Sequence, residues 1–552
     1  MADALRHDAR PNVLIIIMDD LCWGDLACHG NPHTATPHLD QLHGESTRLT
    51  RYCSGPLSTP ARASLMTGRY PYRTRAIDTY LGRSMIDPDE VTLAEVLRDA
   101  GYRTGIFGKW HLGDCYPVRP IDKGFDDGLY HRGGGVGQPS DPAGSSYFDP
   151  ILQRRGRDEQ VKGYCTDIFA DATVEFIRSH RDQPWFAYLA TNAPHSPFDV
   201  PDQWADPYRA KDLPENWARL YGMVENIDHN VGKVMATLDE LGLREDTIVI
   251  YTSDHGPCGS AAVEGKHRWN ADLRGFKSTM YEGGMRVPHF WRWPAKLAAG
   301  RDLDTVANPI DLMPTLAAAC GAALPTDRPI DGENLLPLLT GDLSPDAWRD
   351  RFTFFQWHRG DAPIRYRNYA VVSQRYKLTR PQETKRDELY DIVADPLEQH
   401  DLAGEMPDVV AQMRAAYDAW FDDCSSTRPC NYDPPRIAVG TPHESPTMLT
   451  RQDWRAIGKD DWTDTGLGYW LIDVTAHARY RITVDAPAAD APRTVGMRCG
   501  DVMRTTQLDA GATRWVIDDV PLKRGPAALE AWVDHGDEPA TGVCYVFVER
   551  KA

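Results

Sequence analysis

Four short apolar runs, each followed at once by polar residues, constrain the fold of this chain more than any other feature. They are Val13–Met18, Thr104–Phe107, Trp185–Ala190 and Ile248–Thr252. Between them, from about residue 10 to 345, lie longer segments with the apolar spacing of helices. Short strands that alternate with helices are typical of a sheet covered by helices. The pattern therefore predicts an α/β domain with a mixed central sheet over residues 10–345.

Two further parts follow this domain. Residues 346–432 contain strand-like runs such as FTFFQWH and ELYDI, and we expect them to form a small α+β subdomain that completes a cleft. This part ends in a helix whose apolar residues recur at helical spacing, namely Met406, Val409, Val410, Met413, Tyr417 and Trp420. Residues 433–552 begin with a proline- and glycine-containing connector and continue as alternating strands, which predicts an appended all-β sandwich.

The charge of the chain limits its partners. The 552 residues carry a formal net charge of -19 at pH 7, which argues against non-specific binding to nucleic acid or to an anionic membrane. The longest apolar run near the start, Val13–Met18, is too short to span a bilayer, and no export signal precedes it. On this basis we expect a cytoplasmic protein, or a periplasmic or secreted one if a leader has been removed.

The spacing of the cysteines does not predict a set of disulfide bonds. Eleven of them are scattered along the chain, and no CxxC pair suggests a structural zinc site. Only Cys424 and Cys430 are close neighbours, so a local bridge between these two stays open at this point.

Polar clusters follow all four predicted strands. The clusters are Asp19-Asp20, Gly108–His111, Asn192–His195 and Ser253–Gly256. Because ligands of open α/β sheets bind beyond the carboxyl ends of the strands, we expect these clusters to meet in one crevice. Asp19, Asp20 and Asp254 would repel one another there unless a cation neutralised them, which implies a hard divalent ion. His255 is a candidate nitrogen ligand for the same ion.

Basic side chains in and near these clusters indicate what the site would bind. Lys109, Lys277 and Arg62 would place positive charge beside the metal, which suits an anion with several equivalent oxygens. His111 and His195 titrate near neutral pH and are candidate proton carriers. The residue types therefore predict a site for a sulfate or phosphate ester.

Ser58 stands at the start of a predicted helix. Pro60 suits the first helical turn and residues 61–66 contain good helix formers, so backbone N–H groups and the helix dipole favour negative charge at Ser58. A nucleophilic oxygen at this place could attack the ester of an oxyacid. An unmodified serine, however, is a poor nucleophile without an adjacent base.

At these residues the sequence resembles the formylglycine-dependent sulfatases of the alkaline phosphatase superfamily. Their signature is a cysteine or serine, any residue, proline, any residue and arginine, then a helix that ends near Thr-Gly-Arg. Here it reads Ser58-Thr59-Pro60-Ala61-Arg62, with Thr67-Gly68-Arg69 downstream. Further blocks follow in the family's order: MDDLCWGD, GKWHLG, APHSPF, SDHG, GFKSTMYEGGMRVP, IDLMPTL and LYDIVADPLEQHDLA. The resemblance covers residues 10 to about 425 and implies an alkaline phosphatase-like fold.

The resemblance also implies roles for the site residues. Asp19, Asp20, Asp254 and His255 would hold one divalent cation, Ca²⁺ or Mg²⁺, together with a modified residue 58. Lys109, Lys277 and His195 would bind the sulfate, and Arg62 would steady the nucleophile. The family often has asparagine where this chain has His255.

The implied mechanism starts from formylglycine at position 58, produced by a sulfatase-maturing enzyme and hydrated to a geminal diol. One hydroxyl attacks sulfur in line with the leaving alcohol, and His195 protonates that alcohol. The other hydroxyl is deprotonated with help from His111, and sulfate leaves as the aldehyde re-forms. Most relatives have cysteine where this chain has Ser58. Conversion of Ser58 by the radical-based maturase of some bacteria and replacement of a natural cysteine both stay open.

Other residues lie in polar, aromatic-containing loops of the kind that line carbohydrate pockets. The glycine run HRGGGVGQPSD lacks the strand and helix of a phosphate loop, so we expect it to form a pliable cleft wall. The candidate substrate-cleft residues are His131, Arg132, Gln138, His267, Arg268, Trp357, His358 and Arg365. In the last module, Trp470, Trp515 and Trp532 could stack on sugars, but most tryptophans of sandwiches are core residues. A structural or cleft-shaping role is therefore favoured for that module.

Together these features predict a sulfuric ester hydrolase. Its substrate would be the sulfate ester of a small molecule or of an oligosaccharide, with a sulfated carbohydrate expected. We expect the maturing enzyme as a partner, and neither nucleic acid nor membrane. Two alternatives remain, a phosphate or phosphonate ester hydrolase of the same superfamily and a non-catalytic glycan-binding protein. Alkaline-phosphatase-like members need a second metal, whereas Lys109 and Lys277 take its place here. The sugar, the sulfate position and the oligomeric state are not readable from the sequence.

Overall fold

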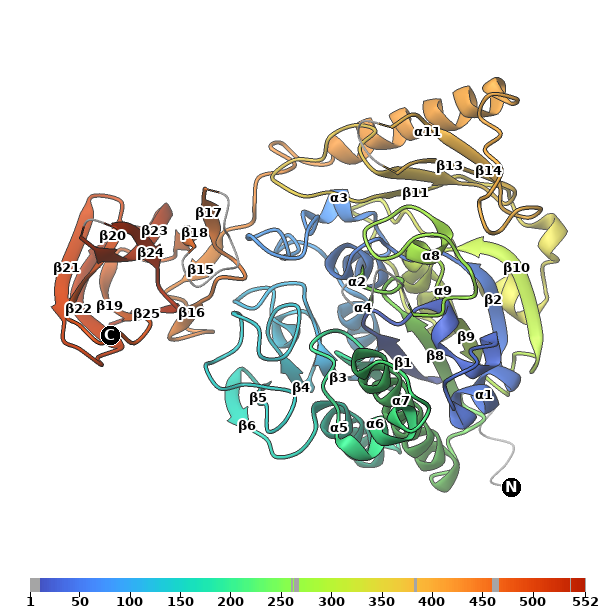
Figure 1. The fold of residues 1–552 in the computed structure, drawn as a ribbon, viewed down its shortest axis with the longest axis horizontal. Helices are drawn as coiled ribbons and strands as arrows, with labels where there is room; N and C mark the ends of the chain where they lie inside the picture. Colours follow the sequence, from blue (N-terminus) through green and yellow to red (C-terminus); the bar gives the residue numbers. More distant parts are fainter. Residues whose placement is uncertain are drawn as a thin grey trace.

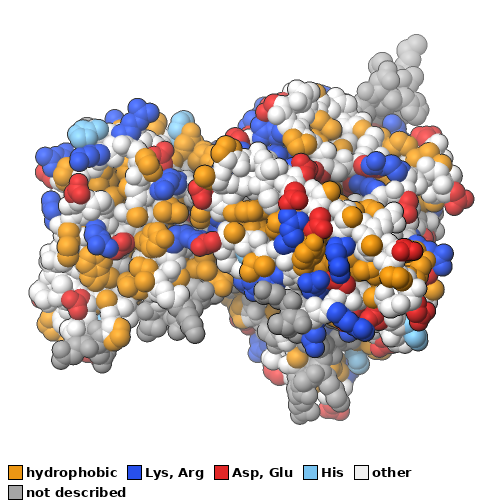
Figure 2. All heavy atoms as spheres, turned by 90° about the horizontal axis from the view of Figure 1, so that it is seen from above, with side chains coloured by type: hydrophobic (Ala, Val, Ile, Leu, Met, Phe, Trp, Pro, Cys, Tyr) orange, Lys and Arg blue, Asp and Glu red, His pale blue; other side chains and the backbone are white. Residues whose placement is uncertain are grey.

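The computed structural model describes residues 10–259, 262, 268–381, 385–458, 466–536 and 538–551. These residues form a larger lobe, which ends with helix α11, and a smaller lobe of C-terminal strands beside it (Figure 1). Figure 2 shows Lys and Arg side chains interspersed with Asp and Glu over both lobes on the face drawn. No large area of one charge stands out on that face.

A ten-stranded mixed sheet forms the centre of the larger lobe. Its spatial order is β10-β2-β9-β8-β1-β7-β3-β4-β5-β6. The strands are β1 (Asn12–Met18), β2 (Thr47–Tyr52), β3 (Arg103–Lys109), β4 (Asp127–His131), β5 (Ile151–Arg154), β6 (Arg157–Gln160), β7 (Trp185–Ala190), β8 (Thr247–Ser253), β9 (His289–Arg292) and β10 (Arg301–Ala307). The four strands predicted from apolar runs are the neighbours β8, β1, β7 and β3, and they run parallel. Their carboxyl ends therefore share one edge of the sheet.

Helices cover both faces of this sheet. They are α1 (Pro37–Gly44), α2 (Ser58–Thr67), α3 (Pro71–Thr74), α4 (Leu93–Asp99), α5 (Cys165–His180), α6 (Asp202–Arg209), α7 (Glu215–Glu240), α8 (Glu282–Met285), α9 (Leu312–Cys320) and α10 (Leu336–Thr340). Alternate residues of β1 pack to opposite sides, Val13 and Ile15 with α2, α4 and α9, and Leu14 and Ile16 with α1, α5 and α7. Because both faces are covered, the central strands are apolar throughout.

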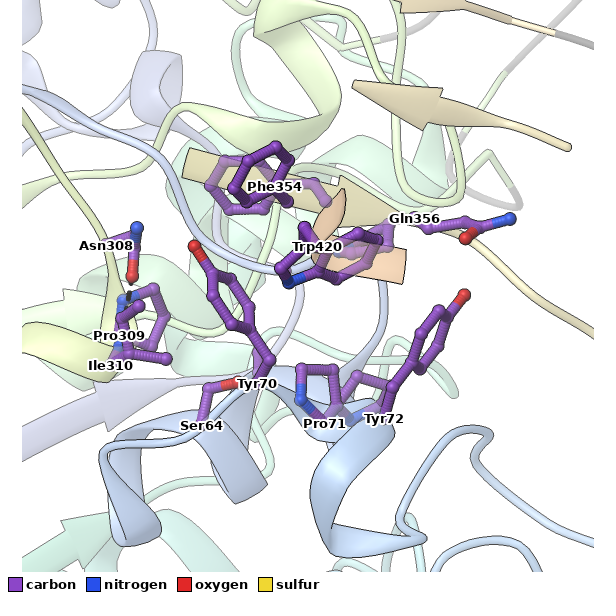
Figure 3. Close-up of a pocket in the computed structure, with 15 residues that line it drawn as sticks. Ser64, Tyr70, Pro71, Tyr72, Asn308, Pro309, Ile310, Phe354, Gln356 and Trp420 are labelled. Carbon is purple, nitrogen blue, oxygen red and sulfur yellow. Dashed lines mark hydrogen bonds between the residues drawn. The ribbon is translucent and has the colours of Figure 1, made fainter. Parts of the chain in front are cut away.

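A second sheet and the longest C-terminal helix complete the larger lobe. Strands β11 (Thr353–Gln356), β12 (Tyr369–Val372), β13 (Tyr376–Arg380) and β14 (Glu388–Asp391) form an antiparallel sheet, and α11 (Pro407–Ser425) packs on it. Trp420 of α11 stacks on Phe354 and meets Tyr70, which precedes α3. Figure 3 shows these three rings around a small cavity of about 30 Å³ beside α2. Aromatic packing thus joins the small sheet to the helix that begins at Ser58.

The smaller lobe is a two-sheet β-sandwich. Its strands are β15 (Ile437–Val439), β16 (Thr447–Leu449), β17 (Arg455–Ile457), β18 (Leu467–Val474), β19 (Ala478–Asp485), β20 (Arg493–Cys499), β21 (Val502–Leu508), β22 (Arg514–Leu522), β23 (Gly525–His535), β24 (Glu538–Gly542) and β25 (Tyr545–Arg550). One sheet contains β15, β18, β23, β20 and β21, and the other contains β16, β25, β19 and β22. Trp470 is fully buried between the sheets, whereas Trp515 and Trp532 are half-buried.

These elements confirm the predicted fold class, an α/β domain with a mixed sheet, a small α+β part and an all-β sandwich. The domain boundaries at residues 345 and 432 stay predictions. All eleven cysteines are free, so the bridge left open between Cys424 and Cys430 is not formed. Among the described helices, none is both long enough and apolar enough to span a bilayer.

Candidate active site

The carboxyl ends of four parallel strands bring the predicted polar clusters together. Asp19 and Asp20 follow β1, Lys109 ends β3, and Asp254 and His255 follow β8. All five side chains are buried, with at most 1% of each residue exposed. The sequence-predicted crevice at this edge of the sheet is therefore present as a buried polar cluster.

Ser58 lies at the centre of this cluster, at the first position of α2. Its Oγ is close to four polar atoms, Asp254 Oδ2 at 2.7 Å and Asp19 Oδ1, His255 Nε2 and Lys109 Nζ each at 3.1 Å. The residue before it, Leu57, is extended, and backbone N–H groups of the first helical turn surround the Ser58 position. An oxygen at residue 58 thus faces carboxylates, a cationic amine and the positive end of a helix.

Arg62 lies one helical turn after Ser58 and holds Asp254. Its Nε and Nη2 donate to Asp254 Oδ2 at 3.1 and 2.9 Å, and both residues are inaccessible to solvent. Ser58 and Arg62 share this face of α2 because a turn contains 3.6 residues. The Arg62 guanidinium therefore fixes the carboxylate nearest to the Ser58 oxygen.

Two lysines balance the other carboxylates. Lys109 Nζ donates to Asp19 Oδ2 at 2.7 Å, and Lys277 Nζ donates to Asp20 Oδ1 at 2.7 Å. The Lys277 side chain is 16% exposed, whereas that of Lys109 is buried. Lys277 is therefore the more accessible of the two amines, and Lys109 is the one in contact with Ser58 Oγ.

Asp20 shows how the carboxylates could hold a metal ion. Ligand atoms of Asp19, Asp20 and His255 lie within 4.8 Å of one another, which is close enough for one ion. Asp20 Oδ2 is buried and has no hydrogen-bond partner among the described residues, so one oxygen is left for a ligand. Oxygen atoms from Asp19, Asp20 and Asp254 form the donor set that hard divalent cations prefer. The residues present therefore fit the cation that the sequence implied.

The charges of the cluster change the pKa values of its acids and bases. Burial alone would raise the pKa of Asp20, but Lys277, His195 and His255 hold it below its usual range. Burial also opposes ionisation of Asp254, yet His255 and Arg62 hold its pKa well below the ordinary value. Both carboxylates are therefore ionised at neutral pH and are available as ligands.

The two candidate proton carriers differ in exposure. His195 is partly exposed, with 16% of its side chain accessible, and its Nε2 is 3.7 Å from Asp20 Oδ2. His111 is buried, and its Nε2 is 2.9 Å from the carbonyl oxygen of Thr79. Burial and the nearby Lys109 charge lower the pKa of His111 well below its usual value. His195 can meet a group that enters from solvent, whereas His111 is a neutral ring in the wall of the site.

Several residues predicted to line the cleft have partners within the protein. Arg268 is buried and donates to Asp25 Oδ1 at 2.7 Å and to the Asp20 carbonyl oxygen at 2.6 Å, so it supports the loop that carries Asp20. Arg132 pairs with Asp158 at 2.6 Å. Arg365 pairs with Asp418 of α11 at 2.8 Å. These three arginines are engaged in ion pairs, and their roles toward a substrate stay predictions.

The remaining predicted cleft residues differ in exposure. His131 and His358 are buried, with Nδ1 of His131 near the Arg132 carbonyl and Nε2 of His358 near that of Gly360. Trp357 is half-buried beside Arg367. Gln138 lines an open cavity of about 190 Å³ between the glycine run and residues 451 and 544–545 of the sandwich. His267 lies outside the described residues.

The structure also identifies site residues that the sequence motifs did not indicate. The Thr79 carbonyl contacts His111, and Asp25 supports Asp20 through Arg268. Gln452, from the sandwich lobe, reaches the same Thr79 carbonyl. Thr79 acts through its backbone, and Gln452 is 341 residues from His111, so no local pattern could have linked them.

Comparison with known proteins shows which proteins this chain resembles over its length. The profile of the Sulfatase family matches residues 11–322, and the profile of the C-terminal part of N-sulphoglucosamine sulphohydrolase matches residues 265–419. Rat (Rattus norvegicus) steryl-sulfatase is 31% identical over 510 residues, covering 73% of this chain and 86% of its own length. Human N-acetylgalactosamine-6-sulfatase is 34% identical over 383 residues, covering 64% of this chain and 69% of its own length.

Solved structures show the same similarity. The crystal structure of Ps i-CgsB in complex with k-i-k-neocarrahexaose superposes with a TM-score of 0.68 at 26% sequence identity. The superposition covers 77% of this chain and 94% of the other. A phosphonate monoester hydrolase from Agrobacterium radiobacter, at 23% identity and a TM-score of 0.53, shares the fold.

Proposed function

Because this chain belongs to the sulfatase family, whose members hydrolyse sulfate esters, we propose that it removes sulfate from a sulfated carbohydrate at the site around residue 58. One observation carries the proposal: the Ser58 oxygen lies within 3.1 Å of Asp19, Asp254, His255 and Lys109. The carbohydrate is supported by two of the relatives. One is named for N-acetylgalactosamine 6-sulfate, and one was crystallised with a neocarrahexaose.

The cation in this proposal is Ca²⁺ or Mg²⁺, held by Asp19, Asp20, Asp254 and His255. When bound, it supplies positive charge that polarises the sulfate oxygens and the oxygen of residue 58. Without it, the three carboxylates are paired with Lys109, Lys277 and Arg62, and the His195 and His255 rings lie beside them. Those three cations balance the carboxylates and leave little attraction for an additional anion.

Residue 58 is proposed to act as formylglycine, made from Ser58 by a maturing enzyme. This modification supplies a hydroxyl nucleophile and a route for releasing sulfate that serine lacks. Arg62 and Asp254 fix the start of α2, so that the attacking oxygen is held beside the anion-binding lysines. Positioning of this kind lowers the barrier by replacing a random encounter with a fixed geometry.

Substrate binding and proton transfer are assigned to the chain's own side chains. Lys109 and Lys277 hold the sulfate oxygens, exchanging part of their contact with Asp19 and Asp20. His195, which is partly exposed, donates a proton to the oxygen of the departing sugar. His111, whose buried ring is neutral and whose backbone carbonyl accepts from Thr59 of α2, takes a proton from the hydroxyl at residue 58.

The test of this function is turnover of matched esters by protein whose residue 58 has been identified by peptide mass. We expect release of sulfate from sulfated mono- or oligosaccharides in the presence of Ca²⁺. Much slower release is expected from simple aryl sulfates and from the phosphate esters of the same sugars. Faster phosphate than sulfate release would instead identify a phosphate ester hydrolase. Binding of sulfated sugars without any release, by protein carrying the aldehyde, would identify a non-catalytic protein.

A further inference from the structure

A segment of the sandwich lobe enters the larger lobe next to the active site. Residues 450–453 connect β16 to β17, and these strands lie on the side of the sandwich that faces the larger lobe (Figure 1). All four residues of the segment are buried, with at most 3% of each exposed. The Gln452 carbonyl accepts from Gly82 N at 3.2 Å, which pairs the segment with the loop at residues 78–84. The two lobes are therefore in contact through main chain as well as side chains.

The Gln452 amide shares a hydrogen-bond acceptor with His111. Its Nε2 donates to the Thr79 carbonyl at 2.6 Å and to Ser84 Oγ at 2.9 Å. His111 Nε2 lies 2.9 Å from the same Thr79 carbonyl and 3.4 Å from Gln452 Nε2. A carbonyl oxygen only accepts, so the Gln452 atom that faces it is the amide nitrogen, and His111 Nε2 carries a proton.

This arrangement determines which nitrogen of His111 is free to act as a base. A neutral imidazole carries its proton on one nitrogen only, so a proton on Nε2 leaves the lone pair on Nδ1. His111 Nδ1 is buried and has no hydrogen-bond partner among the described residues. The Thr59 hydroxyl, next to residue 58, donates to the His111 carbonyl at 3.0 Å. The backbone of His111 is therefore tied to α2 next to residue 58, and its ring has one basic nitrogen without a partner among the described residues.

The position of the Thr79 carbonyl depends on its partners. Residues 78–84 form no helix or strand, and Leu81 and Gly82 have φ values of 60° and 66°. Arg359 contacts the Asp78 carboxylate at 2.6 Å and the Thr79 hydroxyl at 3.1 Å, but neither contact orients the carbonyl. Apart from His111 itself, Gln452 supplies the side-chain donor that the structure shows on this oxygen.

We propose that Gln452 is a positioning residue of the active site, which holds the Thr79 carbonyl and thereby keeps His111 in the tautomer with Nδ1 free. This inference rests on the proposed function, in which His111 accepts a proton from residue 58. It makes the sandwich lobe a part of the catalytic unit, since a residue of that lobe sets the tautomer of a residue in the α/β domain. Orienting a catalytic histidine in this way affects the chemical step and leaves substrate binding unchanged.

The experiment compares two leucine variants of the full-length protein. Gln452→Leu removes the donor to Thr79, and the matched control Glu444→Leu removes contacts from the same lobe to Tyr116 N at 3.0 Å and to Arg119 at 3.5 Å, away from His111. We expect Gln452→Leu to lower kcat by about tenfold or more with KM changed less than about twofold. Glu444→Leu should leave both constants near wild type, while both variants lose some thermal stability. Equal kcat values in the two variants would overturn the proposal.

A second measurement needs no variant at position 452. Nitrogen-15 spectra of histidine-labelled wild-type protein, with the His111 signals assigned by their loss in His111→Asn, report which ring nitrogen carries the proton. A proton on Nε2 supports the proposal, and a proton on Nδ1 overturns it. The kinetics of His111→Asn distinguish a failure of the catalytic role proposed for His111 from a failure of the positioning role proposed for Gln452. Unchanged kcat in that variant contradicts the role of His111 and this inference with it. A large loss there, with normal kcat in Gln452→Leu, contradicts the inference alone.

Discussion

At the scale of single residues, Asp254 connects the parts of the site. Its Oδ2 accepts from Ser58 Oγ at 2.7 Å and from Arg62 Nη2 at 2.9 Å, and its Oδ1 is 3.3 Å from Asp20 N. One carboxylate thus links Ser58, the arginine of α2 and the loop after β1. Its loss would disturb all three at once.

Asp254→Asn is expected to abolish metal binding and to lower the rate of sulfate release by at least about a hundredfold, because it removes a charged ligand and the partner of Arg62. Wild-type protein should gain thermal stability when Ca²⁺ is added and lose it with a chelator, whereas Asp254→Asn should show neither shift. The exposed Asp182→Asn serves as the control and should behave as wild type. A Ca²⁺-dependent melting shift that survives in Asp254→Asn would contradict the assigned metal site.

His195→Ala should affect substrates according to their leaving groups. Its partly exposed side chain is the proposed donor of a proton to the leaving alcohol, so its loss should slow release from sugar sulfates by about a hundredfold. The effect on 4-nitrophenyl sulfate should be less than about tenfold, because that phenolate departs without a proton. Comparing kcat for both substrates in wild type and His195→Ala checks this. Equal losses for the two substrates would assign His195 to sulfate binding instead.

Residues in short, chemically specific motifs could be predicted from the sequence. The structure brings Asp19, Asp20, Ser58, Lys109 and Asp254 together, as expected from strand ends that share one sheet edge. The sequence placed Arg268 in the cleft but did not indicate its ion pair with Asp25. In a polar loop, the local sequence around a buried arginine does not differ from that around an exposed one. Side-chain partners far apart in the chain determine that difference.

At the scale of helices and strands, a buried ionic group joins the small sheet to the short helix α8. Lys377 of β13 lies 3.0 Å from Glu282 of α8 and 2.8 Å from Glu398, and the Glu282 N–H donates to Glu398 at 2.7 Å. Two carboxylates share one lysine, so a single positive charge cannot neutralise both negative charges. Burial and the Glu282 charge raise the pKa of Glu398 to about 7, although Lys377 opposes this shift.

This raised pKa predicts a loss of stability as the pH rises. Between the ordinary value of 4.5 and about 7, folded Glu398 keeps a proton that the unfolded chain releases, so the free energy of unfolding falls across this window. Glu398→Gln cannot titrate at this position, so its free energy of unfolding should not fall in this way. Between pH 5 and pH 8, the difference in free energy of unfolding between Glu398→Gln and wild type should therefore shift in favour of the variant by at most roughly 3 kcal/mol.

Urea denaturation of wild type and Glu398→Gln at pH 5 and pH 8 measures this difference, with the exposed Glu405→Gln as the control. The control should track wild type at both pH values. The pH dependence would be attributed to other groups if Glu398→Gln and wild type lost the same stability between the two conditions.

Trp420 is expected to be important for the attachment of α11. It is 7% exposed, stacks on Phe354 with ring centroids 5.1 Å apart, and meets Tyr70 edge-on at 5.4 Å (Figure 3). Trp420→Ala would enlarge the existing cavity and should cost about 3–5 kcal/mol of stability, measured by denaturant unfolding. The half-buried Trp515→Ala should cost less. A cost below that of Trp515→Ala would show that the junction relaxes around the gap.

Strands differed in how well the sequence predicted them. β1, β3, β7 and β8 are buried on both faces, and their sequences are apolar runs. The sequence therefore predicts the bounds of these strands to within one or two residues. β2, with the sequence TRLTRY, and the fully exposed edge strand β6, with the sequence RDEQ, have no such run. β2 takes its place in the sheet by pairing with the distant strands β9 and β10, which its local sequence does not encode. β6 pairs with its chain neighbour β5 across a short turn, and its polar sequence carries no strand signal.

At the scale of the whole molecule, the apolar core of the sandwich continues into the larger lobe. Buried residues of β1, α2 and α4 belong to the same hydrophobic cluster as Trp454 and Trp470 of the sandwich. Cys115 Sγ also contacts the Met448 carbonyl across the junction, at 3.4 Å. The module predicted as appended is thus a second lobe that shares its apolar core with the larger lobe. The proline-containing connector in the sequence indicated a separate module and gave no sign of this shared core.

A shared core predicts cooperative unfolding. Scanning calorimetry of the full chain should show one main transition that includes both lobes, because separating them would expose buried apolar surface. Gln452→Leu and Glu444→Leu should lower the temperature of that single transition without splitting it. Two transitions in the wild-type protein, with the sandwich melting alone, would show that the lobes are energetically independent.

The burial of α2 has a consequence for how an active molecule is made. Every residue of this helix is buried, and Ser58 is only 2% exposed. A modifying enzyme would have to bind the chain around residue 58, and that chain is buried in the folded helix. The conversion proposed for Ser58 is therefore expected to precede the packing of α2. If Ser58 is converted as proposed, molecules that fold before the conversion would keep the unmodified serine.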